Sequence, residues 1–315
     1  MDVLINILFP IFGIAMIGYF AARMGWLSSS AESGISGFVF NYAVPLMLFR
    51  TIARTDLPDS IPWDLFLSYY LPAFAVYAVG ILLARFAFGR DWLGSVLTGM
   101  GCAFSNTVFL GLPVILLAYG EKAALPFFLI LSVHGLILLS GTTVLVEIVR
   151  SGDGGLSRVP IQVANGLIRN PILIGLVAGM VTNLAGWTLP LPIDRITETM
   201  QGAVLPCALF TLGASLKRYG VAGRVVQSVL LVSLKLAIFP GLVYLFGTYL
   251  FDLDPNWVQI AVLTAAQPTG VMVFIFSQRS GTAQALSTTS IFLSTVGSVV
   301  TLWVILTLFH RASGL

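Results

Sequence analysis

Charged residues are scarce in this chain. Asp, Glu, Lys and Arg together make up 9% of its 315 residues, whereas hydrophobic residues make up 57%. A soluble domain carries roughly 25% charged residues, because its water-facing surface has to be polar. This chain cannot cover such a surface, so its excess apolar residues must face lipid. Its length allows about ten membrane spans of ~20 residues each, with short connections.

Motifs for catalysis or nucleic-acid binding are also absent from the sequence. It contains no GxSxG, HExxH or GxxxxGK[ST] pattern, and its Lys and Arg residues form no long runs. The 2 cysteines, Cys102 and Cys207, lie in apolar stretches. This favours reduced, buried side chains over a disulfide or a metal site. We therefore expect no enzyme activity, no cofactor, no metal and no nucleic-acid partner.

Apolar stretches separated by short polar breaks run along the whole chain. They are too long and continuous for the strands of a membrane barrel, and a helix satisfies its own backbone amides in lipid. The N-terminus lacks the basic segment of a cleaved signal peptide, so we expect the first span to be retained. The sequence predicts an all-α, polytopic membrane protein with ten transmembrane helices, at 3–22, 34–53, 64–88, 93–119, 124–149, 170–187, 197–216, 225–250, 257–278 and 285–309.

The chain divides into two related halves. An offset of 161 residues places Gly18 on Gly179 and Trp26 on Trp187, and it places Asn106 on Gln267. A polar connection at 151–169 separates a first five-helix repeat, 1–150, from a second, 170–315. Because each repeat has an odd number of helices, the second enters the membrane from the opposite side. We therefore expect two inverted repeats that share one scaffold and one transport domain.

The basic residues predict the orientation in the membrane, because they prefer cytoplasmic loops. With the N-terminus outside, ten of the 16 Lys and Arg residues fall on the cytoplasmic side and five on the external side, with Lys235 inside a helix. We expect both termini outside and the 150–169 connection in the cytoplasm.

Predicted helices four and nine carry polar residues, glycine and proline in mid-span. Residues 101–113 read GCAFSNTVFLGLP and residues 264–274 read TAAQPTGVMVF. Proline opens a helix, and the free N–H groups at the opened end attract anions. A kink or a polar helix contact would explain either segment alone, but inverted-repeat transporters bind substrate where broken helices of both halves meet. We predict a site for a small organic anion at Ser105, Asn106, Thr107, Gln267, Pro268 and Thr269.

Other prolines are expected to interrupt or kink helices close to this site. Pro113 lies later in helix four, and Pro45 and Pro206 occupy equivalent places in helices two and seven. Asn41 precedes Pro45 by one turn and is expected to reach the cavity.

Two ionisable residues lie within predicted spans. A charge at the bilayer centre costs ~2.5–3.5 kcal/mol, so it should face a cavity or a partner. Lys235 is a candidate counter-charge for the anion or a group that changes protonation, or else a lysine whose ammonium extends to the membrane surface. His134 is a candidate proton relay, or a neutral histidine hydrogen-bonded between helices.

The sequence resembles the auxin efflux carrier family. The resemblance rests on NTVFLGLPV at 106–114, YGE at 119–121, VPLMLF at 44–49 and the five-plus-five helix pattern, and it covers the whole chain. Its bacterial members include malonate and malate permeases, and its plant members are the PIN auxin exporters. The resemblance implies crossed broken helices, elevator-type alternating access and often a homodimer. Helix four departs from the family pattern, because it has Ser105-Asn106 rather than a proline at the crossing.

The leading interpretation is a secondary transporter of a mono- or dicarboxylate in a bacterial inner membrane. One alternative is a sodium-coupled carrier of the bile-acid type, which would need acidic or carbonyl ligands that are scarce in these spans. Another is a membrane sensor that binds its ligand without transporting it. Such a sensor normally carries a soluble domain, whereas this chain ends shortly after its last span. The substrate, the direction and the coupling ion stay open.

Overall fold

The computed structural model describes residues 7–55, 61–151, 168–217, 219, 221 and 223–312. Within these ranges the regular structure is helical, and the one β-type contact is an isolated bridge between Ser105 and Thr269. This confirms the all-α prediction. Most of the polar connection, 152–167, lies outside the described residues.

Six helical runs in the described ranges are long and apolar enough to cross a membrane, and four shorter apolar helices accompany them. The six are Ser29–Arg54, Trp63–Ala87, Leu125–Arg150, Leu191–Leu216, Val225–Leu250 and Gln284–Arg311, and the shorter ones are Phe9–Arg23, Trp92–Ala103, Thr107–Tyr119 and Pro171–Leu184. A multi-pass membrane protein is thus supported, while the number of spans stays a prediction.

The elements of the first half are α1 (Phe9–Arg23), α2 (Ser29–Phe38), η2 (Val39–Ala43), α3 (Val44–Arg54), α4 (Trp63–Leu82), η3 (Leu83–Ala87), α5 (Trp92–Ala103), η4 (Thr107–Gly111), α6 (Leu112–Tyr119), η5 (Gly120–Ala123) and α7 (Ala124–Ser151). Those of the second half are α9 (Pro171–Leu184), α10 (Leu191–Leu216), α11 (Val225–Ser233), η7 (Leu234–Ile238), α12 (Phe239–Leu245), η8 (Phe246–Leu250), α13 (Pro255–Ala265), α14 (Met272–Ser280) and α15 (Gln284–Ala312). The η elements are π-helical turns, except the 3₁₀ turn η5.

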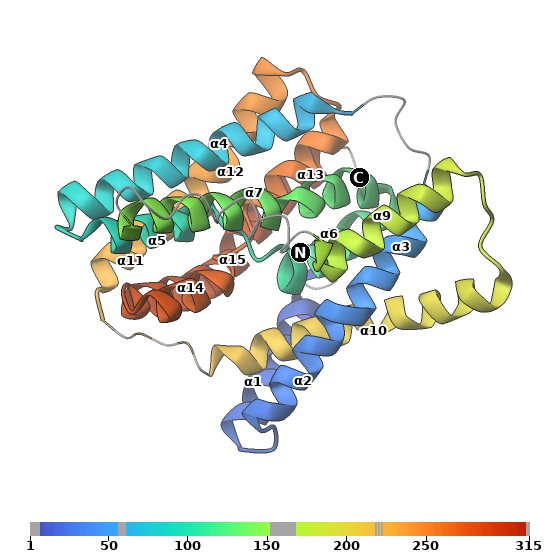
Figure 1. The fold of residues 1–315 in the computed structure, drawn as a ribbon, viewed down its shortest axis with the longest axis horizontal. Helices are drawn as coiled ribbons and strands as arrows, with labels where there is room; N and C mark the ends of the chain where they lie inside the picture. Colours follow the sequence, from blue (N-terminus) through green and yellow to red (C-terminus); the bar gives the residue numbers. More distant parts are fainter. Residues whose placement is uncertain are drawn as a thin grey trace.

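The helices form two bundles, and each bundle contains elements of both halves. In Figure 1, α1, α2 and α3 (blue) lie with α9 and α10 (yellow) in one bundle, whereas α4 and α5 lie with α11 to α15 in the other. Helix α7 contacts members of both bundles. One buried apolar cluster fills the first bundle and continues onto η4 and α6, and a second fills the space among α4, α5, α12 and α13.

Glycines allow α1 to approach α10, and α9 to approach α3, at backbone distance. A Cβ on Gly18 would lie 1.9 Å from the Phe210 oxygen, and a Cβ on Gly179 would lie 2.7 Å from the Phe49 oxygen. The two contacts are related by the same offset of 161 residues that relates the sequences, since Gly18 matches Gly179 and Phe49 matches Phe210. The two helix pairs therefore use one packing pattern twice.

Three of the four prolines expected to break or kink helices do not end a helical run. Pro45 and Pro113 lie in the first turn of α3 and α6, each directly after a π-helical turn, and Pro206 lies inside the continuous α10. A proline has no N–H, so the turn before it loses a hydrogen bond, and the wider π turn accommodates that loss. The interruptions lie elsewhere, at 104–106 and 266–271.

Candidate functional site

Two helices are interrupted and cross each other through short extended segments. The first interruption separates α5 from η4, and the second separates α13 from α14. The segments pair antiparallel at Ser105 and Thr269. The Asn106 N–H donates to the Pro268 oxygen at 2.8 Å, and the Gly270 N–H donates to the Phe104 oxygen at 2.9 Å. Each interrupted segment thus provides a carbonyl oxygen that accepts a backbone N–H of the other segment.

The antiparallel pairing is centred on Ser105 and Thr269, which are 164 residues apart (269 − 105) and not 161. The two backbone bonds exchange with each other under this offset, since Phe104 matches Pro268 and Asn106 matches Gly270. The prediction that Asn106 lies opposite Gln267 is therefore wrong. Gly120 and Gly281, which end the helices after the breaks with positive φ, again match at 161. The second half thus has three more residues before its break and three fewer after it.

Long helices of each half hold the crossing from outside through its backbone N–H groups. The Ser105 N–H donates to His134 Nε2 of α7 at 3.2 Å, and the Thr269 N–H donates to Ser294 Oγ of α15 at 3.0 Å. Because Nε2 accepts this bond, it carries no proton, so the imidazole is neutral in this arrangement. His134 is buried against the rings of Phe104 and Tyr69.

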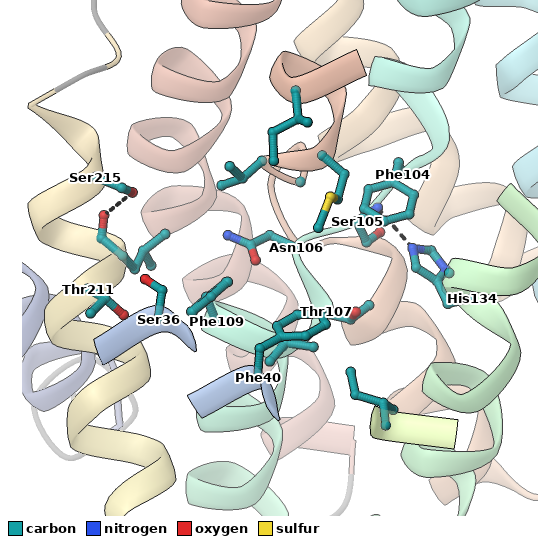
Figure 2. Close-up of a pocket in the computed structure, with 18 of the residues that line it drawn as sticks. Ser36, Phe40, Phe104, Ser105, Asn106, Thr107, Phe109, His134, Thr211 and Ser215 are labelled. Carbon is teal, nitrogen blue, oxygen red and sulfur yellow. Dashed lines mark hydrogen bonds between the residues drawn. The ribbon is translucent and has the colours of Figure 1, made fainter. Parts of the chain in front are cut away.

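A cavity of about 420 Å³ opens on one side of the crossing. Figure 2 shows Asn106 projecting between a wall that carries Ser36, Thr211 and Ser215 and a wall that carries Ser105 and His134. The first wall belongs to α2 and α10, and the second to the crossing and α7. The cavity therefore lies between the two bundles, and most of its surface is apolar.

Asn106 is the polar side chain best placed to bind a ligand. The side chain lines the cavity, is 5% exposed, and makes no hydrogen bond with any residue that the structure describes. An amide offers two N–H donors and a carbonyl acceptor. Both kinds of group are thus available to a molecule in the cavity.

Two helix starts also face the cavity. Thr107, Val108 and Phe109 open the helical run η4–α6, and Gly270, Val271 and Met272 lead into α14. The first N–H groups of a helix have no acceptor within it, and its dipole places partial positive charge there. Among the described residues no Lys or Arg lines the cavity. The Thr107 and Gly270 N–H groups already donate to the Ser105 and Phe104 oxygens. Any attraction for an anion therefore comes from the amides that follow them and from Asn106.

Three predicted site residues of the second half lie behind the cavity. Gln267 is fully buried, and its Nε2 donates to the Leu263 oxygen of its own helix at 2.9 Å. Thr269 donates its hydroxyl to the Gly101 oxygen at 3.0 Å. Pro268 supplies the carbonyl that Asn106 N–H binds. These residues shape the crossing and do not line the cavity, because the second half presents its following residues, 270–272, to it.

Asn41 and Lys235 do not line the cavity either. Asn41 lies on the π turn η2 with an exposed side chain. Lys235 is fully buried, with its ammonium bonded to Ser105 Oγ at 2.9 Å and to the Ala265 oxygen. It therefore lies behind the crossing and does not contact a ligand in the cavity. Of the predicted residues, Ser105, Asn106, Thr107 and His134 do line it.

Several cavity residues escaped the sequence prediction. Gly270 and Met272 lie within the predicted segment 264–274, just after the predicted site residues 267–269, and a shift of the expected site by three residues would have included them. Thr211 and Ser215 lie one turn apart on α10, a spacing that marks one helix face. Glu32, at the start of α2, is buried beside the same cavity. Glu32 was not predicted because it lies just before the predicted second span, 34–53.

The sequence matches a known family over nearly its full length. The model of the family described as membrane transport protein matches residues 3–306. The chain belongs to this family, that of the auxin efflux carriers. The resemblance inferred from the motifs is thereby confirmed.

Relatives in this family come from bacteria, plants and animals. A protein of Rhizobium meliloti (strain 1021) that is provisionally named a malonate transporter is 28% identical over 94% of this chain and 92% of its own length. Auxin efflux carrier component 8 of Arabidopsis thaliana is 26% identical over 85% of this chain and 87% of its own. The lysosomal cholesterol signaling protein of Mus musculus is 23% identical over 73% of this chain, which is only 28% of that protein. Transporter names among its relatives suggest that this family member is not an enzyme.

Proposed function

We propose that this protein is a secondary transporter that binds a small organic anion, a mono- or dicarboxylate, at the crossing of its two interrupted helices. The observation that carries the proposal is the convergence of two helix starts and the Asn106 amide on one cavity. Among the residues that the structure describes, this amide has no hydrogen-bond partner and no basic side chain lines the cavity. Free amides at a helix start bind carboxylates well. The relative named for malonate, a dicarboxylate, supports the same substrate class.

The size and surface of the cavity fit such a ligand. Small-molecule sites typically occupy about 300–1,000 Å³ and combine apolar walls with a few placed polar groups. This cavity, at about 420 Å³, is near the lower end of that range. Phe40, Phe104 and Phe109 give it apolar walls for the carbon skeleton of a ligand. The carboxylate would lie at the helix starts beside Asn106.

Ten membrane spans in two inverted five-helix repeats form the proposed architecture. Three pairs of features support it: the glycine contacts of Gly18 and Gly179, the two exchanged bonds at the crossing, and the glycine ends at Gly120 and Gly281. We further propose alternating access of the elevator type, in which the bundle carrying the crossing moves against the other. The position of the cavity between the bundles supports this motion. A homodimer would steady the fixed bundle.

The proposed conformation is open toward the cytoplasm. The cavity extends from Asn106 to Glu32, Asn170 and Ser215, at the start of α2 and α9 and the end of α10. The nearby Arg23, Arg169 and Lys217 are among the basic residues that the charge distribution assigns to the cytoplasmic side. This orientation would leave both termini outside, in a bacterial inner membrane.

A binding assay on the purified protein tests the site. Malonate, malate and an aryl acetate serve as ligands, each measured by calorimetry. Replacing Asn106 by alanine should remove hydrogen bonds to a charged group, worth about 1.5–3 kcal/mol, and weaken binding roughly 10- to 150-fold. Asn41→Ala is the matched control, because its amide is exposed outside the cavity. Equal affinity in the Asn106 variant and the wild type would rule out this site.

Flux measurements separate the transporter from a sensor. The relative named as a signaling protein supports the sensor alternative, since it contains a related segment within a much longer chain. Proteoliposomes loaded with a ligand that binds should show uptake or exchange that Asn106→Ala slows. A ligand that binds at the cavity but crosses the membrane no faster than in empty vesicles would favour the sensor.

A further inference from the structure

A main-chain carbonyl is left open where α13 ends. In a continuous helix the Ala265 oxygen would accept the N–H of Thr269, four residues on. Here the Thr269 N–H donates to Ser294 instead, and Pro268 has no N–H to offer. The Ala265 oxygen also lies at the negative end of α13. A buried carbonyl needs another donor, and the Lys235 ammonium supplies it.

In the first half, the corresponding carbonyl near the end of α5 is hydrogen-bonded by an uncharged side chain. Under the offset of 164 residues, Gly101 corresponds to Ala265 and Ser105 corresponds to Thr269. The Gly101 oxygen accepts the Thr269 hydroxyl directly, at 3.0 Å. The corresponding direct bond would run from the Ser105 hydroxyl to the Ala265 oxygen. Instead the Lys235 ammonium bonds to both of these oxygens.

The ammonium has a partner for each of its three hydrogens. Two face the Ser105 and Ala265 oxygens, and the third side lies over the Phe239 ring, 4.9 Å from its centre. A cation is attracted to the face of an aromatic ring. The described residues provide no ion pair for Lys235, whose side chain is fully buried. Its charge is thus balanced by helix and side-chain dipoles and a ring, not by a carboxylate.

The two oxygen atoms that bind the Lys235 ammonium are of the kind that also coordinate a small monovalent cation. A carbonyl oxygen and a hydroxyl oxygen that meet at a helix end form the kind of site that binds Na⁺ at the broken helices of transporters. We propose that the Lys235 ammonium is a built-in cation that occupies such a site and locks the crossing, so that the protein needs no bound Na⁺ there. Lys235 is a positioning residue, because it acts on the crossing from behind the cavity. This inference goes beyond the proposed function and holds whatever ligand the cavity takes.

Cation rescue of a truncated lysine tests the proposal. The purified, ligand-free protein is heated in buffers that contain choline, Na⁺ or n-propylammonium as the only added cation. Lys235→Ala should lower the melting temperature by roughly 5–10 °C in choline, because the buried Ala265 oxygen loses its donor and the Ser105 hydroxyl keeps only its 3.5 Å contact with the Tyr69 hydroxyl. Na⁺ or propylammonium, which are small enough to enter the vacated space, should restore at least half of that loss. Choline is too bulky to do so.

Two controls distinguish a cation site from general loss of packing. Lys235→Met fills the space without a charge, so it should be destabilised and should not respond to the small cations. Thr269→Ala removes the hydrogen bond from the Thr269 hydroxyl to the Gly101 oxygen. The stability that this variant loses should also be independent of the cation. A Lys235→Ala variant that is as stable as the wild type, or that no small cation restores, would overturn the proposal.

The wild type provides a test that does not depend on folding of a variant. Its melting temperature in the absence of ligand should be the same in Na⁺ and in choline. A stabilisation of the wild type by Na⁺ would show that the site is open to external cations, and would also overturn the proposal. Because no substrate is present, these outcomes are independent of the binding and flux measurements.

Discussion

The contact between α1 and α10 leads to the most direct test of the structure. A Cβ on Gly213 would lie 1.6 Å from the Ala15 oxygen, and a Cβ on Gly18 would lie 1.9 Å from the Phe210 oxygen. A carbon rarely approaches an oxygen closer than about 3.3 Å. Replacing either glycine by alanine therefore forces the two helices apart by about 1.5 Å. We expect each variant to lose stability.

The magnitude follows from the packing that this separation disrupts. A gap of 0.5–1 Å already removes a quarter to a half of the attraction between two atoms, and overpacking typically costs about 1–3 kcal/mol. We expect each variant to be destabilised by about 2–4 kcal/mol, at or above the upper end of that range, because backbone atoms are involved. Gly13 on α1 and Gly202 on α10 are the matched controls, since a Cβ on either has no neighbour within 4 Å. Alanine there should be neutral or stabilising by up to about 1 kcal/mol.

A double substitution sharpens this test. Gly18→Ala and Gly213→Ala force the same separation, so the double variant should lose clearly less stability than the two single losses together. By contrast, Gly18→Ala and Gly179→Ala act on different helix pairs and should be additive. The assay is thermal unfolding in detergent, followed by size-exclusion chromatography. The reasoning fails if Gly13→Ala is as harmful as Gly18→Ala, or if the Gly18 and Gly213 losses add.

Two further predictions concern polar contacts of the first bundle. Asn183 donates its amide to the Ile52 and Thr55 oxygens at the end of α3, so Asn183→Ala should destabilise the protein by roughly 1–3 kcal/mol. Thr182→Ala, whose hydroxyl bonds only within its own helix, should change the melting temperature little, and equal effects would refute the assignment. Asp194, 12% exposed at its side chain, pairs with Arg50 and Arg54, and we expect Asp194→Asn to cost about 1–3 kcal/mol. The largely exposed Glu198 serves as its control: Glu198→Gln should cost under about 1 kcal/mol, and an Asp194→Asn variant as stable as this control would show that the pair contributes nothing.

The repeat illustrates what could be predicted from the chain alone and where the prediction stopped. Gly18 and Gly179 match in the sequence and make matching contacts in the structure, because both lie in helices of unchanged register. Near the breaks the same offset matched Asn106 with Gln267, whereas the two exchanged backbone bonds of the crossing make Gly270 the equivalent of Asn106 in the second half. Helices of different length before and after the break shift the register by three residues. Sequence identity in apolar segments is too sparse to reveal such a shift.

Composition alone was enough to predict a membrane protein, because so few charges cannot cover a surface in water, and the long continuous apolar stretches predicted that its spans are helices. The mid-span polar residues of 101–113 and 264–274 also located the two interruptions. Only the tertiary structure decided which side chains face the cavity. Once a helix is interrupted its period no longer predicts direction, so Asn106 points into the cavity while Gln267 turns back onto its own helix. The partners of Lys235 were likewise hidden, because they are a carbonyl and a hydroxyl that become available only where two distant segments cross.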